Sequence, residues 1–166
     1  MKKLHALAGI IAIGLAFPAM AHTHAQGKPQ QERLKADVEK LVSFGTRHTL
    51  SSATDPKRGI GAARKWAHNE FQKMAKACNG CLQTELLERN ISGPRVPNGV
   101  NIVDVLAIKP GNMGWDHVII IAGHIDSRVS DVMDFTKDAP GANDDGSGSA
   151  LVMEAARIMS QQPQNE

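Results

Sequence analysis

The stretch that decides the fold and chemistry of this chain reads Val-Ile-Ile-Ile-Ala-Gly-His-Ile-Asp-Ser, at residues 118–127. Its first five residues form a β-branched apolar run of the kind that fills a buried strand. His124 and Asp126 follow two residues apart, so in an extended chain their side chains point to the same side. We therefore expect an imidazole and a carboxylate to meet above the carboxyl end of a strand, where open α/β sheets place their ligands.

A second stretch, Pro-Gly-Ala-Asn-Asp-Asp-Gly-Ser-Gly at residues 140–148, directly precedes a helical pattern of apolar residues. Taken singly, Asp145 suits the start of that helix and His124 suits an ordinary strand end. Taken together, the two stretches supply imidazole and carboxylate groups without a thiolate. This set of donors suits zinc, or a similar divalent ion that keeps a coordination position for water.

The two stretches, followed by Ala-Leu-Val-Met-Glu-Ala-Ala-Arg at residues 150–157, resemble the M28 family of zinc metallopeptidases. These are co-catalytic aminopeptidases and related carboxypeptidases. The resemblance is close over the later part of the chain and looser from about residue 32 onward. It implies an α/β fold of the zinc exopeptidase type, in which helices flank a mixed central β-sheet.

The resemblance also implies a role for each acidic or imidazole side chain of the site. His124 would be a terminal ligand of zinc, and Asp144 would bridge the two zinc ions of the complete enzyme. Asp126, the candidate catalytic residue, would bond to the His124 ring and so fix its tautomer. Asp145 would support the turn without binding metal, and the Asp144–Asp145 peptide bond would be cis.

The site implied by the resemblance is incomplete in this sequence. In the family, a later strand brings a Glu-Glu pair that supplies the general base and a zinc ligand, and a later Asp and His complete the site. Glu154 and Glu166 do not stand in that strand context. We therefore interpret the chain as the N-terminal part of such an enzyme, with the C-terminal part of the fold missing. By itself it should bind zinc weakly and be inactive.

Residues 1–21 have the pattern of a secretory signal peptide: a basic start, a short apolar run and an Ala-Met-Ala cleavage site. The apolar run is too short to span a membrane. Residues 22–30 then form a polar linker, and we expect one domain over residues 31–166, in the periplasm or outside the cell. Loss of Lys2 and Lys3 on cleavage takes the formal charge from +2 to 0, so no basic excess points to nucleic acid or to a membrane surface.

Cys78 and Cys81 flank an Asn-Gly turn and are the chain's two cysteines. A structural zinc site would need a second pair of ligands, and a thioredoxin-type motif would follow a strand, whereas this pair follows a helical pattern. Because an exported protein meets an oxidising compartment, we expect a local disulfide, with free thiols as the alternative.

Periodicity and turn signals predict the remaining architecture. Between the first two helices, Arg47 and His48 fit a hydrogen-bonded loop better than the wall of a cleft. Three strands and a later helix suggest a mixed sheet covered by helices. The expected elements are helices at 31–44 and 57–77, strands at 82–88, 100–108 and 118–122, and a helix after residue 145.

The leading hypothesis is a secreted or periplasmic zinc aminopeptidase that hydrolyses N-terminal peptide bonds, with peptides as its partners. One alternative is a single-zinc enzyme similar to glutaminyl cyclase, although Asp144, Asp145 and His124 together favour two metal ions. The other alternative is a non-catalytic binding or structural domain on the same scaffold, since a fold does not imply a function.

Overall fold

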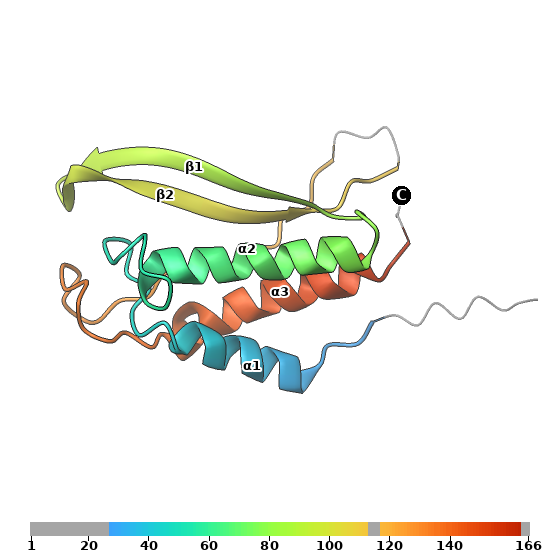
Figure 1. The fold of residues 1–166 in the computed structure, drawn as a ribbon, viewed down its shortest axis with the longest axis horizontal. Coiled ribbons are helices and arrows are strands. Elements are labelled where there is room, and N and C mark those ends of the chain that lie inside the picture. Colours follow the sequence, from blue (N-terminus) through green and yellow to red (C-terminus); the bar gives the residue numbers. More distant parts are fainter. Residues whose placement is uncertain (1–26, 113–116, 164–166) are drawn as a thin grey trace, which may run out of the picture.

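The computed structural model describes residues 27–112 and 117–163, so the expected signal peptide lies outside the described residues. A long hairpin lies along one side of α2, and α3 and α1 lie on its other side (Figure 1). The elements in chain order are α1 (Gln31–Val42), α2 (Gly59–Ala77), β1 (Gln83–Gly93), β2 (Val96–Ile108), the kinked turn η1 (Ala142–Gly146) and α3 (Ser147–Ser160).

The α2 helix forms the centre of the fold because its apolar residues recur at helical spacing and are buried on one side. Phe71 and Met74 pack with Leu82, at the start of the hairpin, and with Met153 of α3. The helix expected at residues 57–77 is therefore confirmed, and it begins at Gly59. The buried apolar residues of α2 are Ile60, Ala62, Ala63, Ala67, Phe71 and Met74.

The connection from α2 to the hairpin is a tight turn. Asn79 and Gly80 both have positive φ, at 55° and 84°. Cys78 and Cys81 are joined by a disulfide across this turn, with Cα atoms 5.4 Å apart. The turn thereby directs the chain from the end of α2 straight into β1.

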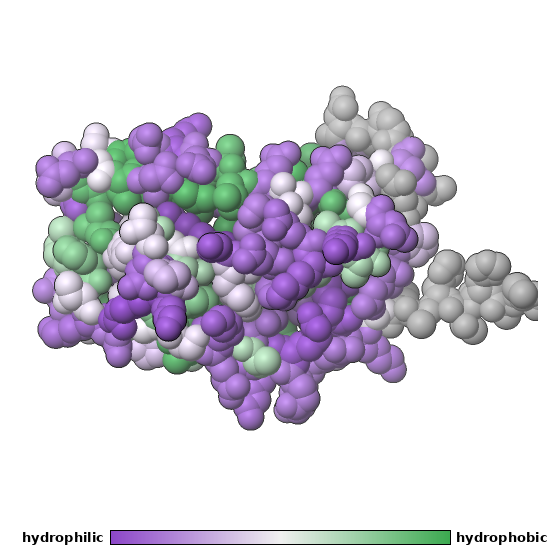
Figure 2. All heavy atoms as spheres, in the orientation of Figure 1, coloured by the Kyte–Doolittle hydropathy of each residue, from purple (hydrophilic) through white to green (hydrophobic). Residues whose placement is uncertain are grey.

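β1 and β2 pair antiparallel, with Gln83 opposite Ile108 and Ile91 opposite Val100. Both strands were predicted, and both extend further towards the turn than the alternation indicated. Apolar side chains gather over this hairpin at the surface (Figure 2), where Leu87 is 59% exposed. The fold is mixed α/β as expected, but the sheet of the described residues has two strands.

The prediction of a buried strand at residues 118–122 is wrong for this structure. The run belongs to no strand, and Val118, Ile119 and Ile120 are 82%, 92% and 81% exposed. A strand needs a partner for its backbone N–H and C=O groups, and among the residues that the structure describes β2 pairs with β1 alone. The end of the run instead faces β2, α2 and α3 across a cavity of about 750 Å³.

Within the described ranges, no helix is both long and apolar enough to cross a membrane.

Candidate metal centre

The two sequence stretches of the site lie against each other, although the first is not a strand. A Cβ atom added to Gly123 would lie 2.8 Å from the carbonyl carbon of Gly148, so only a glycine allows this approach. The Ser149 hydroxyl donates a hydrogen bond to the carbonyl oxygen of His124 at 3.0 Å. The end of the apolar run is therefore held on the first turn of α3.

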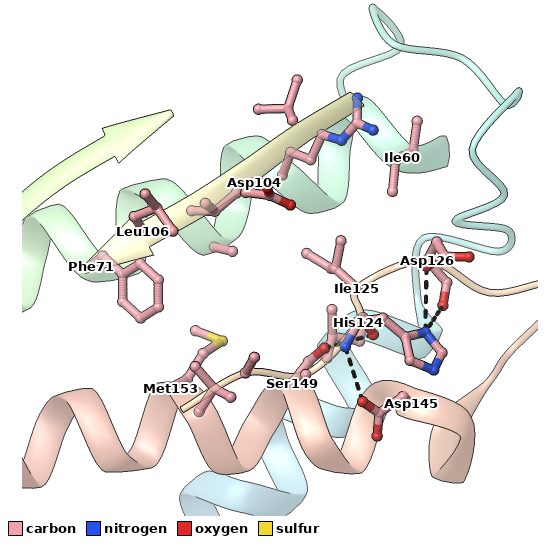
Figure 3. A pocket seen from close by; sticks show the side chains of 18 of the residues that line it. Ile60, Phe71, Asp104, Leu106, His124, Ile125, Asp126, Asp145, Ser149 and Met153 are labelled. Atoms are coloured by element: carbon pink, nitrogen blue, oxygen red, sulfur yellow. Dashed lines mark hydrogen bonds and ion pairs between the residues drawn. The ribbon is translucent and has the colours of Figure 1, made fainter. Parts of the chain in front are cut away.

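Asp145 supports both stretches at once, as Figure 3 shows for its bond to His124. One carboxylate oxygen accepts a hydrogen bond from the His124 backbone N–H at 3.0 Å. The other accepts a hydrogen bond from the Gly148 N–H at 3.0 Å, in the manner of a helix N-cap. Asp145 thus has the supporting place that was expected for it.

Asp144 and Asp145 interrupt the helical geometry of η1, with φ/ψ of −111°/95° and −125°/43°. The peptide bond between them is cis, as the resemblance implies. Asp145 is half-buried, whereas the Asp144 side chain is 90% exposed. The two neighbouring carboxylates therefore lie in different environments, Asp145 within the fold and Asp144 in solvent.

The His124 ring lies between the other two candidate carboxylates. Its Nε2 atom is 3.1 Å from Asp144 Oδ1. Its Nδ1 atom faces Asp126, at 3.3 Å from the backbone oxygen and 3.4 Å from Oδ1 (Figure 3). A hollow of about 230 Å³ lies beside the ring, lined by all three side chains and by residues 127–130. The structure thus brings His124, Asp126 and Asp144 together.

The distance between His124 Nε2 and Asp144 Oδ1 fits a shared zinc ion. Zinc binds imidazole nitrogen and carboxylate oxygen at about 2.0–2.2 Å, so two tetrahedral ligands stand roughly 3.4 Å apart. The observed 3.1 Å is close to that value. Among residues 27–112 and 117–163, however, no group of three or more His, Cys, Asp and Glu side chains is placed to hold a metal. Of the ligands that the resemblance implies, the described residues thus bring His124 and Asp144 together, without a third ligand beside them.

Two aspartates in the loop that follows the His124 stretch, Asp134 and Asp138, interact with other partners. The Lys137 ammonium and the Thr136 hydroxyl both donate to Asp134, and these hydrogen bonds hold the pKa of its carboxyl well below the usual range. Asp138 pairs with Arg58 at 2.5 Å. Neither belongs to the His124 site.

The loop between α1 and α2 contributes residues whose importance the sequence did not reveal. Arg47 and His48 were predicted to form a hydrogen-bonded loop, and this is confirmed. His48 Nδ1 accepts a hydrogen bond from the Leu50 N–H, and its Nε2 lies 3.1 Å from the Val132 carbonyl oxygen. Arg47 is completely buried beside the metal-site loops. The position of this arginine directly after Gly45 and Thr46 is the one feature of the sequence that could have drawn attention to Arg47.

Comparison with known proteins finds relatives over most of this chain. Residues 101–166 match the model of Peptidase family M28. A "Probable zinc metalloprotease" of Pyricularia oryzae is 48% identical over 136 residues, which cover 81% of this chain and 27% of that protein. A protein of the same name from Pyrenophora tritici-repentis is 46% identical over 130 residues, 77% of this chain and 27% of that protein.

A third relative, leucine aminopeptidase 1 of Aspergillus oryzae, is 30% identical over 135 residues, covering 81% of this chain and 30% of that protein. The chain thus spans less than a third of the length of these relatives. The family match includes both stretches that build the site around His124 and Asp144. With that match and these relatives, the chain belongs to peptidase family M28.

Proposed function

We propose that this chain forms part of the active site of a zinc-dependent exopeptidase of the aminopeptidase type, which removes residues from the N-terminus of peptides. The placement of His124 Nε2 at 3.1 Å from Asp144, beside a hollow open to solvent, carries the proposal. The names of the zinc metalloprotease relatives support zinc and proteolysis. The leucine aminopeptidase relative supports the exopeptidase class.

Each side chain of the cluster has a distinct role in this proposal. His124 and Asp144 would hold zinc, with Asp144 shared between two ions. Bound zinc would supply polarisation of the scissile carbonyl and an activated water. His124 can bind metal through Nε2 only when its ring proton is on Nδ1. Asp126 supports that tautomer, because its backbone and carboxylate oxygens are the acceptors nearest to Nδ1.

We also propose that the protein works in the periplasm or outside the cell. The disulfide between Cys78 and Cys81 supports this location, because disulfides persist in oxidising compartments and are rare in the cytosol. Fractionation of cells that express the gene, followed by blotting, tests the proposal. Protein found only in the cytosol would contradict it.

Zinc calorimetry on this chain tests the metal site. We expect His124→Ala and Asp144→Asn to remove the heat of zinc binding. His117→Ala and Asp131→Asn, which change exposed residues of the same types, should leave it unchanged. Zinc binding that survives both site substitutions would refute the assignment of these ligands.

The activity is tested on the complete gene product with chromogenic aminoacyl substrates. We expect zinc-dependent turnover that is lost in the His124→Ala and Asp144→Asn variants. A complete product that binds zinc at this site and hydrolyses no substrate would instead support the non-catalytic alternative.

A further inference from the structure

Arg47 is a cation buried in an unusual setting. Its side chain is completely inaccessible to solvent, in the loop that joins α1 to α2. Among the described residues no carboxylate forms an ion pair with it; backbone carbonyl oxygens accept its hydrogen bonds instead. Burial lowers the pKa of the Arg47 guanidinium, and the nearby Asp126 charge opposes that effect. Since a buried charge is costly, the hydrogen bonds around it must be well formed.

The guanidinium joins the two stretches that carry the proposed ligands. Its Nε atom donates to the Ile125 carbonyl oxygen at 2.7 Å, between His124 and Asp126. On the other side, Nη1 donates to the Pro140 oxygen at 2.8 Å and Nη2 to the Gly141 oxygen at 3.0 Å. Three donors of one rigid, planar group thus fix the backbone on both sides of the metal site.

The same guanidinium is anchored to the end of α1. A second bond from Nη1 reaches the Leu41 carbonyl oxygen at 2.9 Å. Leu41 lies in the last turn of that helix, where the helix dipole favours a positive charge. The position of the Arg47 side chain is therefore set by a regular element as well as by the two loops.

The backbone of Arg47 makes a second connection through Ser127. The Arg47 N–H donates to Ser127 Oγ at 3.0 Å, and that hydroxyl donates to the Ala139 carbonyl oxygen at 2.7 Å. Ser127 is itself buried, at 3% exposure. The hydroxyl thus links the end of the His124 stretch to the start of the Asp144 stretch.

Gly141 shows how closely the second stretch packs on this group. Its φ is +46°, and an added Cβ would lie 3.0 Å from Arg47 Nη2 and 2.7 Å from the Asp144 carbonyl oxygen. A side chain at this position would have to displace the guanidinium or the Asp144 backbone. The turn at Gly141 therefore contacts both the Arg47 guanidinium and the backbone of Asp144.

We infer that Arg47 is the positioning residue of the proposed metal site, and that its guanidinium sets the separation between His124 and Asp144. The inference rests on the proposed function in so far as it calls the site a metal site. The clamp, by which we mean the hydrogen bonds from the Arg47 guanidinium to the two stretches, is a property of the metal-free protein. Arg47 touches neither substrate nor metal in this account. A lysine could not replace it, because one ammonium group cannot reach carbonyl oxygens of three separate segments in the geometry of the planar fork.

The test compares Arg47→Lys with a matched control, Arg157→Lys. Arg157 is also a buried arginine, but it pairs with Glu154 at the far end of α3. Two quantities are measured on the whole chain for each variant. The first is amide hydrogen exchange of Ser127, Ala139 and Gly146 in metal-free protein, and the second is Co²⁺ affinity from visible absorption.

We expect Arg47→Lys to speed exchange at these amides by about tenfold, since charge-assisted hydrogen bonds are lost. Co²⁺ affinity should fall by about tenfold or more, the usual effect of losing a group that orients metal ligands. Arg157→Lys should change neither quantity, even where it lowers the melting temperature as much. Unchanged exchange and affinity in Arg47→Lys, or equal changes in Arg157→Lys, would overturn the inference.

Two further outcomes are covered by the design. If Arg47→Lys does not fold, Arg47→Gln, which buries no charge and keeps only one donor group, should speed exchange at Ala139 and weaken Co²⁺ binding; no change there would refute the role of the guanidinium. If the unmodified chain binds no Co²⁺, the proposed metal site fails, while hydrogen exchange in the metal-free variants still decides whether Arg47 holds the two loops.

Discussion

Replacing Asp144 and Asp145 one at a time should separate metal binding from stability. The two residues are adjacent and have the same side chain, yet Asp144 is 90% exposed and faces His124. Asp145 accepts two backbone hydrogen bonds, from His124 and Gly148, each at 3.0 Å. We expect Asp145→Ala to destabilise the fold and Asp144→Ala to leave it nearly unchanged.

The magnitude follows from these contacts. Loss of the cap-like bond to Gly148 should cost about 1 kcal/mol. Loss of the charge-assisted bond to the His124 N–H should cost roughly 1.5 kcal/mol more, so Asp145→Ala should lower the free energy of unfolding by about 2–3 kcal/mol. Asp145→Asn keeps one acceptor oxygen and should lose about half as much. The exposed Asp144–His124 contact should contribute under about 1 kcal/mol.

Urea unfolding followed by circular dichroism measures these differences. At a slope of roughly 1.5 kcal/mol per molar urea, Asp145→Ala should move the midpoint down by about 1.3–2 M. Zinc calorimetry on the same proteins should show the opposite order, with binding lost in Asp144→Ala. If Asp144→Ala destabilised the chain as much as Asp145→Ala, the division of labour between the two carboxylates would be refuted.

Other predictions concern the buried ion pair, the isolated chain and the apolar run. The hydrogen bond from Arg157 lowers the pKa of the buried Glu154 carboxyl. The ionised carboxylate therefore stabilises the folded protein fully above the unfolded-state pKa of about 4.3. This stabilisation is lost as the pH falls through the lower folded-state pKa. The urea midpoint should therefore drop on acidification below about pH 4, and Glu154→Gln should remove that part of the pH dependence. The purified chain should bind zinc weakly and show no aminopeptidase turnover with chromogenic substrates, because two ligands leave half of a tetrahedral shell to water; zinc-dependent turnover would show that a ligand has been overlooked. The exposed run at 118–121 should cause association that rises with protein concentration, and Ile119→Lys should reduce it in analytical ultracentrifugation; a monomeric unmodified chain at high concentration would contradict this.

Local sequence patterns predicted which side chains of the candidate site lie together. His124 and Asp126 are two residues apart, and Asp144 and Asp145 directly precede a helix, so short-range geometry decides where these side chains point. The three helices and the hairpin also follow from periodicity over short windows. In each case the information lies within a few residues of the element that it specifies.

The fate of the apolar run at 118–122 could not be predicted in the same way. Its β-branched composition describes a segment that fits a buried strand, but a strand forms only where another strand offers backbone partners. In this structure β2 pairs with β1 on one edge, and its residues 102–106 face the run across the cavity; the described part of the chain forms no further strand there. The sequence pattern therefore shows that this run is suited to a buried strand, whereas the elements around it determine whether the strand forms.

Arg47 shows why the supporting residues of a site are harder to predict than the ligands. Its carbonyl partners at Ile125 and Gly141 lie 78 and 94 residues away in sequence. Because every residue has a carbonyl group, nothing in the sequence marks which carbonyls will meet a given guanidinium. The ligands are restricted to a few residue types, and so they leave a recognisable motif. The positioning residue that we infer, Arg47, makes its side-chain contacts with backbone carbonyl oxygens, so only the folded chain brings it to light.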